Sequence, residues 1–165
     1  DDFRSFFKAD KQREKQNLYT LVAESMKLLE GGMKSRKITL ENDVGRELDI
    51  DVFSNEFKQV LINIVNNAID TIMLRDVKDG NIRISSGRVE TGTAIYIQDN
   101  GHGIQAEDKE KIFEPYFTTK SALNGTGLGL YISKIIIEDH HKGKLRFENS
   151  QNGALFTIVI PDNLA

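Results

Sequence analysis

The chain has 165 residues, of which 39% are hydrophobic and 28% are charged. This composition suits one domain with a sizeable core, and the length argues against a second full domain. A net charge of -3 gives no bulk electrostatic reason to bind nucleic acid, and the lack of cysteine excludes disulfides and Cys-ligated zinc. No apolar run approaches the about 20 residues that span a bilayer, and no signal peptide is visible. The first residue is Asp, so we expect an excised fragment of a longer protein.

The first thirty residues combine a charged segment with a predicted helix. Residues 1–14 are highly charged apart from three phenylalanines, as in a frayed tail. Residues 21–33 repeat apolar side chains at helical spacing, and Gly31 and Gly32 are expected to loosen the end of that helix.

Five segments have the pattern of strands. Apolar and polar side chains alternate over the first two segments, as in half-buried strands. Together the segments predict a five-stranded sheet with helices on one face. They comprise residues 37–44, 80–89, 93–99, 143–149 and 153–160.

Residues 56–70 are predicted to form a helix with an apolar stripe made of Phe57, Leu61, Ile64, Ala68 and Ile72. Asn63, Asn67 and Asp70 are spaced four and three apart, so they line a neighbouring face. Asparagine is unfavourable inside helices, because its amide competes for backbone hydrogen bonds. An amide oxygen can bind Mg²⁺ together with phosphate oxygens and water, and a solvated polar face is the alternative.

Asp99 shares a strand face with Ile95 and Ile97, which predicts a buried carboxylate. A buried carboxylate needs hydrogen-bond donors, and the exocyclic amine of a purine is one that fits. Gly101 and Gly103 follow, and they permit a turn with positive φ and close approach of backbone to a flat ligand. An Asx turn that closes the strand is the alternative.

Residues 100–125 are too long for an ordinary connection, and we expect a lid there. The Phe-rich residues 113–117 give this segment apolar anchors, which equally suit a small core under a long loop. Lys120, which follows Thr118 and Thr119, is a candidate contact for a terminal phosphate. An exposed lid lysine without a role is the alternative.

Gly125, Gly127 and Gly129 precede a predicted apolar helix at residues 130–138. Glycines at a helix start expose backbone N–H groups at its positive end, which suits a phosphate, although a flexible cap would look the same. The run is not a Walker A loop, because no Gly-Lys-Ser/Thr follows. It is not a Rossmann motif either, since Ile132 takes the place of the last glycine.

These motifs occur in a fixed order: an asparagine helix, an Asp-x-Gly-x-Gly turn, a Phe-rich segment and a Gly-x-Gly-x-Gly helix start. In that order they resemble the N, G1, F and G2 boxes of the catalytic, ATP-binding domain of two-component sensor histidine kinases, which belong to the GHKL superfamily. The resemblance covers about residues 17–161, and four ordered motifs are more specific than any one alone.

The resemblance implies the Bergerat fold, an α/β (α+β) two-layer sandwich. We expect a mixed, roughly five-stranded sheet with about three helices on one face and a mobile ATP lid at about residues 100–126. Residues 1–14 would be the end of a dimerisation helix and a linker, and residues 15–165 the catalytic domain.

The resemblance also implies ATP and Mg²⁺ as cofactors and assigns residues to them. Asn67 and Asn63 would hold Mg²⁺, and Asp99 would accept a hydrogen bond from adenine. Thr157 would support Asp99, unless it only fills the core. Asn63 and Lys120 are the predicted catalytic residues. The other predicted ATP contacts are Gly101, Gly103, Ile104, Phe117, Thr118, Thr119, Lys120, Gly125, Thr126, Gly127, Leu128, Gly129 and Leu130.

ATP-hydrolysing relatives of this fold, such as gyrase and Hsp90-like proteins, carry a glutamate one helical turn before the metal-binding asparagine. This chain has Asn63 there, and an amide is a poor proton acceptor, so attack by water should be slow. The favoured reaction is transfer of the γ-phosphate to a histidine on the dimerisation domain, mainly by positioning and charge neutralisation, and onward to an aspartate of a response regulator. Asp70 and Thr71 replace the Lys-Tyr or Lys-Phe that often follows the N box, which leaves the role of Asp70 open.

None of the three histidines fits the phosphoacceptor. His102 lies in the glycine turn, and His140 and His141 fall where the second glycine helix ends, as in a terminus that tolerates positive charge. The isolated chain should therefore bind ATP without phosphorylating itself. The expected partners are its own dimerisation domain and a response regulator receiver domain, with a monomeric fragment and a homodimeric full protein.

We expect a cytoplasmic location, either in a cytoplasmic protein or in the cytoplasmic part of a membrane sensor. Two other functions stay open. One is an ATPase or serine kinase of the same superfamily, and the other is a non-catalytic nucleotide-binding module that regulates a partner.

Overall fold

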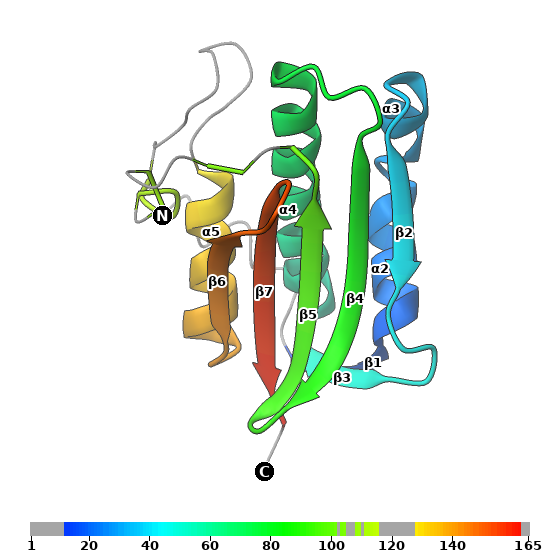
Figure 1. Ribbon diagram of the computed structural model, residues 1–165. Helices are drawn as coiled ribbons and strands as arrows, with labels where there is room; N and C mark the ends of the chain where they lie inside the picture. The colour runs from blue at the N-terminus through cyan, green and yellow to red at the C-terminus, as the bar shows by residue number, and fades with distance from the viewer. Residues whose placement is uncertain (1–11, 102, 105–107, 110, 116–127, 163–165) are drawn as a thin grey trace.

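The computed structural model describes residues 12–101, 103–104, 108–109, 111–115 and 128–162. Strands and helices form two layers (Figure 1). In chain order they are β1 (Glu14–Asn17), α2 (Leu18–Lys27), α3 (Glu30–Ser35), β2 (Thr39–Asp43), β3 (Asp49–Val52), α4 (Ser54–Leu74), β4 (Asn81–Val89), β5 (Gly92–Asp99), α5 (Gly129–Lys134), the π-helical segment η2 (Ile135–His140), β6 (Lys144–Asn149) and β7 (Ala154–Pro161).

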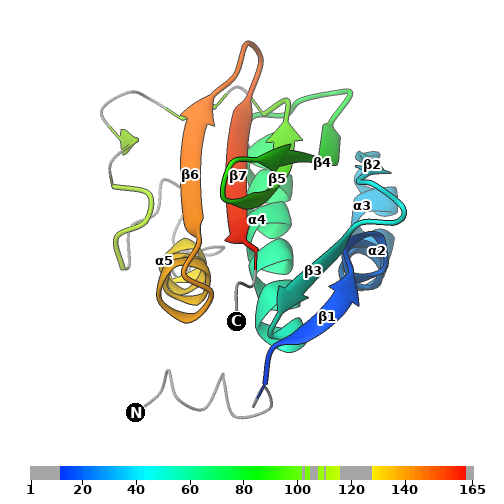
Figure 2. The same cartoon turned by 90° about the horizontal axis from the view of Figure 1, so that it is seen from below.

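The main sheet has five strands in the order β2-β4-β5-β7-β6. β2 and β4 are parallel, and the other neighbouring pairs are antiparallel. The predicted mixed sheet is thus confirmed, with strand ends that agree to within two residues. α2, α4 and α5 lie against one face of the sheet, as Figures 1 and 2 show. None of the described helices covers the other face.

α4 forms the centre of the helical layer. Its predicted stripe is buried, with Phe57, Leu61, Ile64, Ala68 and Ile72 each at most 1% exposed. Val60, Val65 and Ile69 are buried as well, because α2 and α5 pack on the flanks of α4. Burying one such side chain stabilises the fold by roughly 1.5–3 kcal/mol. The packed stripe holds the remaining polar face of α4 in a fixed orientation beside the end of β5.

The predicted single helix at residues 21–33 is wrong in detail, because the structure has two helices there. α2 begins at Leu18, where the Asn17 side chain accepts the N–H of Thr20 at 2.9 Å as an N-cap. The chain turns between α2 and α3, at Leu28 and Leu29, and Leu29 packs against the core whereas Leu28 is 75% exposed. Gly31 and Gly32 lie inside α3 and do not end it.

A small second sheet was not predicted. β1 pairs antiparallel with β3, from Glu14 opposite Val52 to Asn17 opposite Asp49. Figure 2 shows this two-stranded sheet beside α2, apart from the main sheet. In the described part of the chain, none of the helices is long and apolar enough to cross a membrane.

Candidate functional site

Asp99 ends β5 as a buried carboxylate, with 6% of the residue exposed, as predicted. Its Oδ1 accepts the N–H of Gly101 at 2.8 Å, which is the Asx turn, and the N–H of Ala154 at 3.4 Å. No donor among the described residues is bonded to Oδ2. Burial raises the pKa of Asp99, although the Gly101 and Ala154 N–H groups and the charge of Arg75 act in the opposite direction. Asp99 can therefore close the turn and still accept a hydrogen bond from a ligand.

The turn between β6 and β7 packs directly onto the Asp99 turn, which we define as residues 99–101, 103 and 104. Gly103 has φ +73°, and a Cβ there would lie 2.5 Å from Asn149 Oδ1 and 2.9 Å from the Gly153 carbonyl oxygen. A Cβ on Gly153 would lie 1.8 Å from the carbonyl oxygen of Asp99. Only glycine permits this approach at both positions. The contact fixes the backbone around Asp99 from the side of β7.

Two asparagine amides bind the Asp99 turn to its surroundings, and sequence reasoning assigned a role to neither. Asn149 donates to the Ile104 carbonyl at 2.7 Å and accepts the Ile104 N–H at 2.9 Å. Asn100 donates to the Asp79 carbonyl at 2.7 Å and accepts the Asn81 N–H at 2.8 Å. Asn149 and Ile104 are 45 residues apart in the chain, so no local sequence pattern predicts the contact.

Asn63 is engaged by protein groups at both ends of its amide. Its Nδ2 donates to the Gly129 carbonyl at 3.1 Å and to Ser133 Oγ at 3.2 Å, while its Oδ1 accepts from Gln59 Nε2 at 2.7 Å. Ser133 is fully buried, so these bonds join α4 to the start of α5. The oxygen with which Asn63 was predicted to bind Mg²⁺ already has a donor. Asn63 therefore fits a link between the two helices better than a metal ligand.

Asn67 lies one turn further along α4 and differs from Asn63. No hydrogen bond to its side chain is formed by the described residues, whereas its backbone carbonyl accepts from Thr71 Oγ1 at 2.9 Å. In the same part of the chain, no cluster of His, Cys, Asp or Glu is arranged to hold a metal ion. Mg²⁺ accepts an amide oxygen when phosphate and water complete its shell, and the Asn67 amide fits that chemistry.

The start of α5 faces this polar surface of α4. A Cβ on Gly129 would lie 3.7 Å from the Cβ of Asn63, and Leu128 and Leu130 pack against the core. The structure therefore brings Gly129 to the predicted metal face of α4. Outside the described residues lie Phe117, Thr118, Thr119, Lys120, Gly125, Thr126, Gly127 and His102.

The lid anchors form a small core, which was one of the two predicted roles of the Phe-rich segment. Ile112 is 7% exposed, and the ring of Phe113 meets that of Phe156 edge-on at 6.3 Å between centroids. Lys134 Nζ lies 4.9 Å from the centroid of Phe113. The middle of the predicted lid, at Phe113, is thus attached to β7 and α5.

Thr157 does not support Asp99, and that prediction is wrong. Thr157 pairs in register with Tyr96, whereas Phe156 pairs with Ile97, which lies on the face of Asp99. Adjacent residues of a strand point to opposite faces, so Thr157 lies on the face away from Asp99. The core-filling alternative is also wrong, because that face carries no described helix and Thr157 is only half-buried. Ala154, through its N–H, is the β7 residue that contacts Asp99.

The predicted role of the paired histidines as a positively charged terminus is wrong for His141. His141 is fully buried, its Nε2 accepts the N–H of Phe53 at 3.0 Å, and its Nδ1 lies 2.8 Å from the Ile136 carbonyl. These partners require the neutral tautomer with hydrogen on Nδ1. His140 Nδ1 lies 2.8 Å from Glu56 Oε1. Both histidines therefore join the end of η2 to the start of α4.

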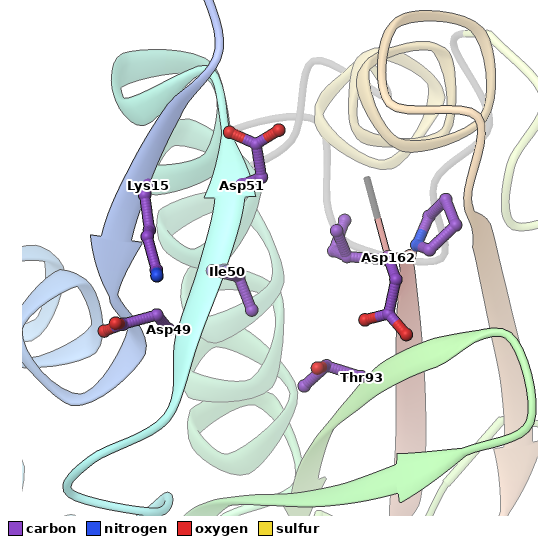
Figure 3. A pocket seen from close by; sticks show the side chains of 8 residues that line it. Lys15, Asp49, Ile50, Asp51, Thr93 and Asp162 are labelled. Atoms are coloured by element: carbon purple, nitrogen blue, oxygen red, sulfur yellow. The ribbon is translucent and has the colours of Figure 1, made fainter. Parts of the chain in front are cut away.

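A cavity of about 360 Å³ lies near the opposite end of β5, between the two sheets (Figure 3). Three carboxylates line it, and they would repel a phosphate. Asp162 is paired with Arg88 at 2.7 Å, and Asp51 lies 3.7 Å from Arg13 Nε. This cavity is therefore separate from the Asp99 site. It is lined by Lys15, Asp49, Ile50, Asp51, Thr93, Ile160, Pro161 and Asp162.

Comparison with known proteins gives consistent matches. Residues 53–164 match the family described as "Histidine kinase-, DNA gyrase B-, and HSP90-like ATPase". The signal transduction histidine-protein kinase AtoS of Escherichia coli is 37% identical over 150 residues, which cover 89% of this chain and 24% of AtoS. The chain therefore spans about a quarter of the length of that relative.

Solved structures agree with the sequence matches. The catalytic domain of histidine kinase ThkA superposes with a TM-score of 0.81 at 37% identity, covering 92% of this chain and 97% of that chain. A structure of ThkA in complex with the response regulator protein TrrA superposes with a TM-score of 0.75 at 35% identity, covering 92% of this chain and 42% of that chain. The likeness thus extends over nearly all of this chain.

Proposed function

This chain belongs to the family of histidine kinase-, DNA gyrase B-, and HSP90-like ATPases, and on that premise we propose that it binds Mg-ATP and donates the γ-phosphate. The acceptor would be a histidine on the dimerisation domain of a sensor kinase, and an aspartate of a response regulator would receive the phosphate next. The complex of ThkA with a response regulator supports such a partner class.

The observation that carries the proposal is the unshared Oδ2 of Asp99. The carboxylate is buried, its Oδ1 is used by two backbone N–H groups, and no described residue donates to Oδ2. Keeping a carboxylate in that position is unfavourable unless a ligand supplies a donor. The exocyclic amine of adenine is such a donor.

Mg²⁺ would be held through the amide oxygen of Asn67. When bound, the ion would neutralise charge on the phosphates. Asn63, which we had also predicted as a ligand, would instead hold α5 against α4. Gly129, at the start of α5, would then be kept close to the phosphates.

Asn63 also favours phosphate transfer over hydrolysis. Asn63 occupies the position of the glutamate in ATP-hydrolysing relatives, and both ends of its amide are hydrogen-bonded to protein groups. An amide does not take a proton from water as a carboxylate can, and Gln59 already uses one acceptor position of this oxygen. The chain would therefore protect the γ-phosphate from water and rely on a nucleophile from another domain.

The histidines of the described residues are unsuited to be that nucleophile. His141 is fully buried with both ring nitrogens bonded, and His140 lies against Glu56. The isolated chain should therefore bind ATP without taking up phosphate. Mass spectrometry that found stoichiometric acid-labile phosphate on the chain after incubation with Mg-ATP would contradict this.

The test is calorimetric titration of the chain with ADP and ATP, with and without Mg²⁺. Asp99→Asn should lower nucleotide affinity by about tenfold or more, because its side chain amide no longer offers an anionic acceptor. Asn67→Ala should remove the effect of Mg²⁺ on affinity. The matched control is Asn66→Ala, since Asn66 is exposed on the same helix. If the wild type binds neither nucleotide, the proposed function fails.

A further inference from the structure

Asn149 pairs with the Asp99 turn much as one strand residue pairs with another, except that Asn149 uses its side-chain amide instead of its backbone. Asn149 is the last residue of β6, and its amide both donates to the Ile104 carbonyl at 2.7 Å and accepts the Ile104 N–H at 2.9 Å. The two bonds run in opposite directions between one amide and one residue, which fixes both the distance and the rotation of that residue's backbone. Asn149 Oδ1 also lies against Gly103.

No other described group makes a hydrogen bond to Gly103 or Ile104. Gly103 has φ +73°. Glycine adopts positive and negative φ about equally well, so the residue type alone does not fix the backbone conformation here. Asn149 is thus the described residue that fixes this backbone by hydrogen bonds, in addition to the packing of Ile104 against the core. The same backbone follows Asp99 closely and would form the wall beside the base.

We propose that Asn149 is a positioning residue for nucleotide recognition. It would hold the backbone of Gly103 and Ile104 where the base lies flat against them with its amine directed at Asp99 Oδ2. Preorganisation of this kind increases affinity, because the ordering of the wall is not left to the binding step. The inference rests on the proposed function and adds a residue outside the four boxes to it.

Base selectivity distinguishes this role from a merely structural one. Asp99 accepts from the amine of adenine, whereas guanine presents a carbonyl oxygen at that position and would be repelled. Selectivity for ADP over GDP therefore requires that the base be held in register with Asp99. A general loss of stability would weaken binding of both nucleotides equally and leave their ratio unchanged.

The experiment is titration of the wild type, Asn149→Ala and Asn152→Ala with ADP and with GDP. Asn152 lies in the same β6–β7 turn, is exposed and makes no hydrogen bond with the described residues, so it is the matched control. For Asn149→Ala we expect ADP affinity to fall by about tenfold, as suits two lost hydrogen bonds, with a smaller fall for GDP. Asn152→Ala should match the wild type. Thermal unfolding of Asn152→Ala should match the wild type, and Asn149→Ala should lose no more stability than suits two exposed hydrogen bonds.

Asn149→Asp is the second variant, because aspartate has nearly the same size and shape as asparagine. It keeps an oxygen that accepts the Ile104 N–H but turns a second oxygen toward the Ile104 carbonyl, so ADP affinity should fall as well. Wild-type ADP affinity in both Asn149 variants, or an equal loss for ADP and GDP, overturns the inference and leaves the proposed function intact. Lack of ADP binding by the wild type overturns the proposed function, and the inference with it.

Discussion

His141 Nε2 accepts the backbone N–H of Phe53 at 3.0 Å, and this bond joins the end of η2 to the residue that precedes α4. The ring of Phe53 lies edge-on to that of His141, with 5.2 Å between centroids. Phe53 occupies the N-cap position of α4, where its side chain makes no capping hydrogen bond. A histidine 88 residues away therefore satisfies a donor at the start of the helix that bears Asn63 and Asn67.

We predict that His141→Ala lowers the free energy of unfolding by about 2–4 kcal/mol, because it leaves a cavity and an unpaired N–H at Phe53. Urea denaturation monitored by circular dichroism measures this. Asp139→Ala, an exposed change in the same helix, should stay within about 0.5 kcal/mol of the wild type. A His141→Ala variant as stable as the Asp139→Ala control would contradict the role of this bond.

Asp99 should make the fold less stable at neutral pH than an uncharged residue would. Its folded pKa is raised above 3.8 by burial, so between pH 3.8 and the raised value the folded state binds more protons than the unfolded state. Stability therefore decreases as pH rises through that window, and the loss persists above it. We predict that Asp99→Asn is more stable than the wild type at pH 7, with a gain that shrinks toward pH 3.8.

Urea denaturation of both proteins over that pH range tests the prediction. Asp162→Asn is the opposite control, because Arg88 lowers the pKa of Asp162 and the paired carboxylate is exposed. Its removal should give no gain at pH 7. An Asp99→Asn variant that is less stable than the wild type at neutral pH would show that the ionised carboxylate is well accommodated in the absence of nucleotide.

Asn63 and Asn67 were both predicted to hold Mg²⁺, but the structure predicts different effects on stability when each is replaced by alanine. Asn63→Ala removes three hydrogen bonds that involve Gly129, Ser133 and Gln59, so it should lower stability by about 1–2 kcal/mol. Asn67→Ala removes no side-chain bond to the described residues and should change stability little. Ser133→Ala should show coupling with Asn63→Ala in a double-mutant cycle, whereas Asn67→Ala should be additive with it.

Periodicity explains which parts of this fold could be predicted. The stripe from Phe57 to Ile72 and the alternation around Ile95, Ile97 and Asp99 are local patterns, and both were confirmed. The prediction for Thr157 was wrong because the face on which it lies relative to Asp99 depends on the register between β5 and β7. The sequence of one strand alone does not reveal that register. The β1–β3 sheet was missed because each strand has only four residues, β1 is wholly polar, and the two strands pair over more than thirty residues.

The residues of the candidate site also differ in whether the sequence alone could indicate them. Asp99, Gly101 and Gly103 were found because a buried acid followed by glycines is unusual in a strand end. Asn149 was missed because its partner Ile104 lies 45 residues away. The spacing in the sequence places Asn63 and Asn67 on one helix face, but it does not reveal which of the two amides is hydrogen-bonded to other protein groups.

Gly153 tests how closely the β6–β7 turn must approach Asp99. A Cβ at this position would lie 1.8 Å from the Asp99 carbonyl oxygen and 2.6 Å from its carbon, so the backbone must move before alanine fits. We predict that Gly153→Ala lowers the free energy of unfolding by about 2 kcal/mol or more and weakens nucleotide binding, because the N–H of Ala154 is drawn away from Asp99.

Gly31→Ala is the matched control. A Cβ there meets nothing within 4 Å, and α3 is helical, so alanine should stabilise the chain by up to about 1 kcal/mol. Parallel urea denaturation and ADP titration of the two variants measure both effects. If Gly153→Ala bound ADP as tightly as the wild type, the close contact between the two turns would not be needed for the site.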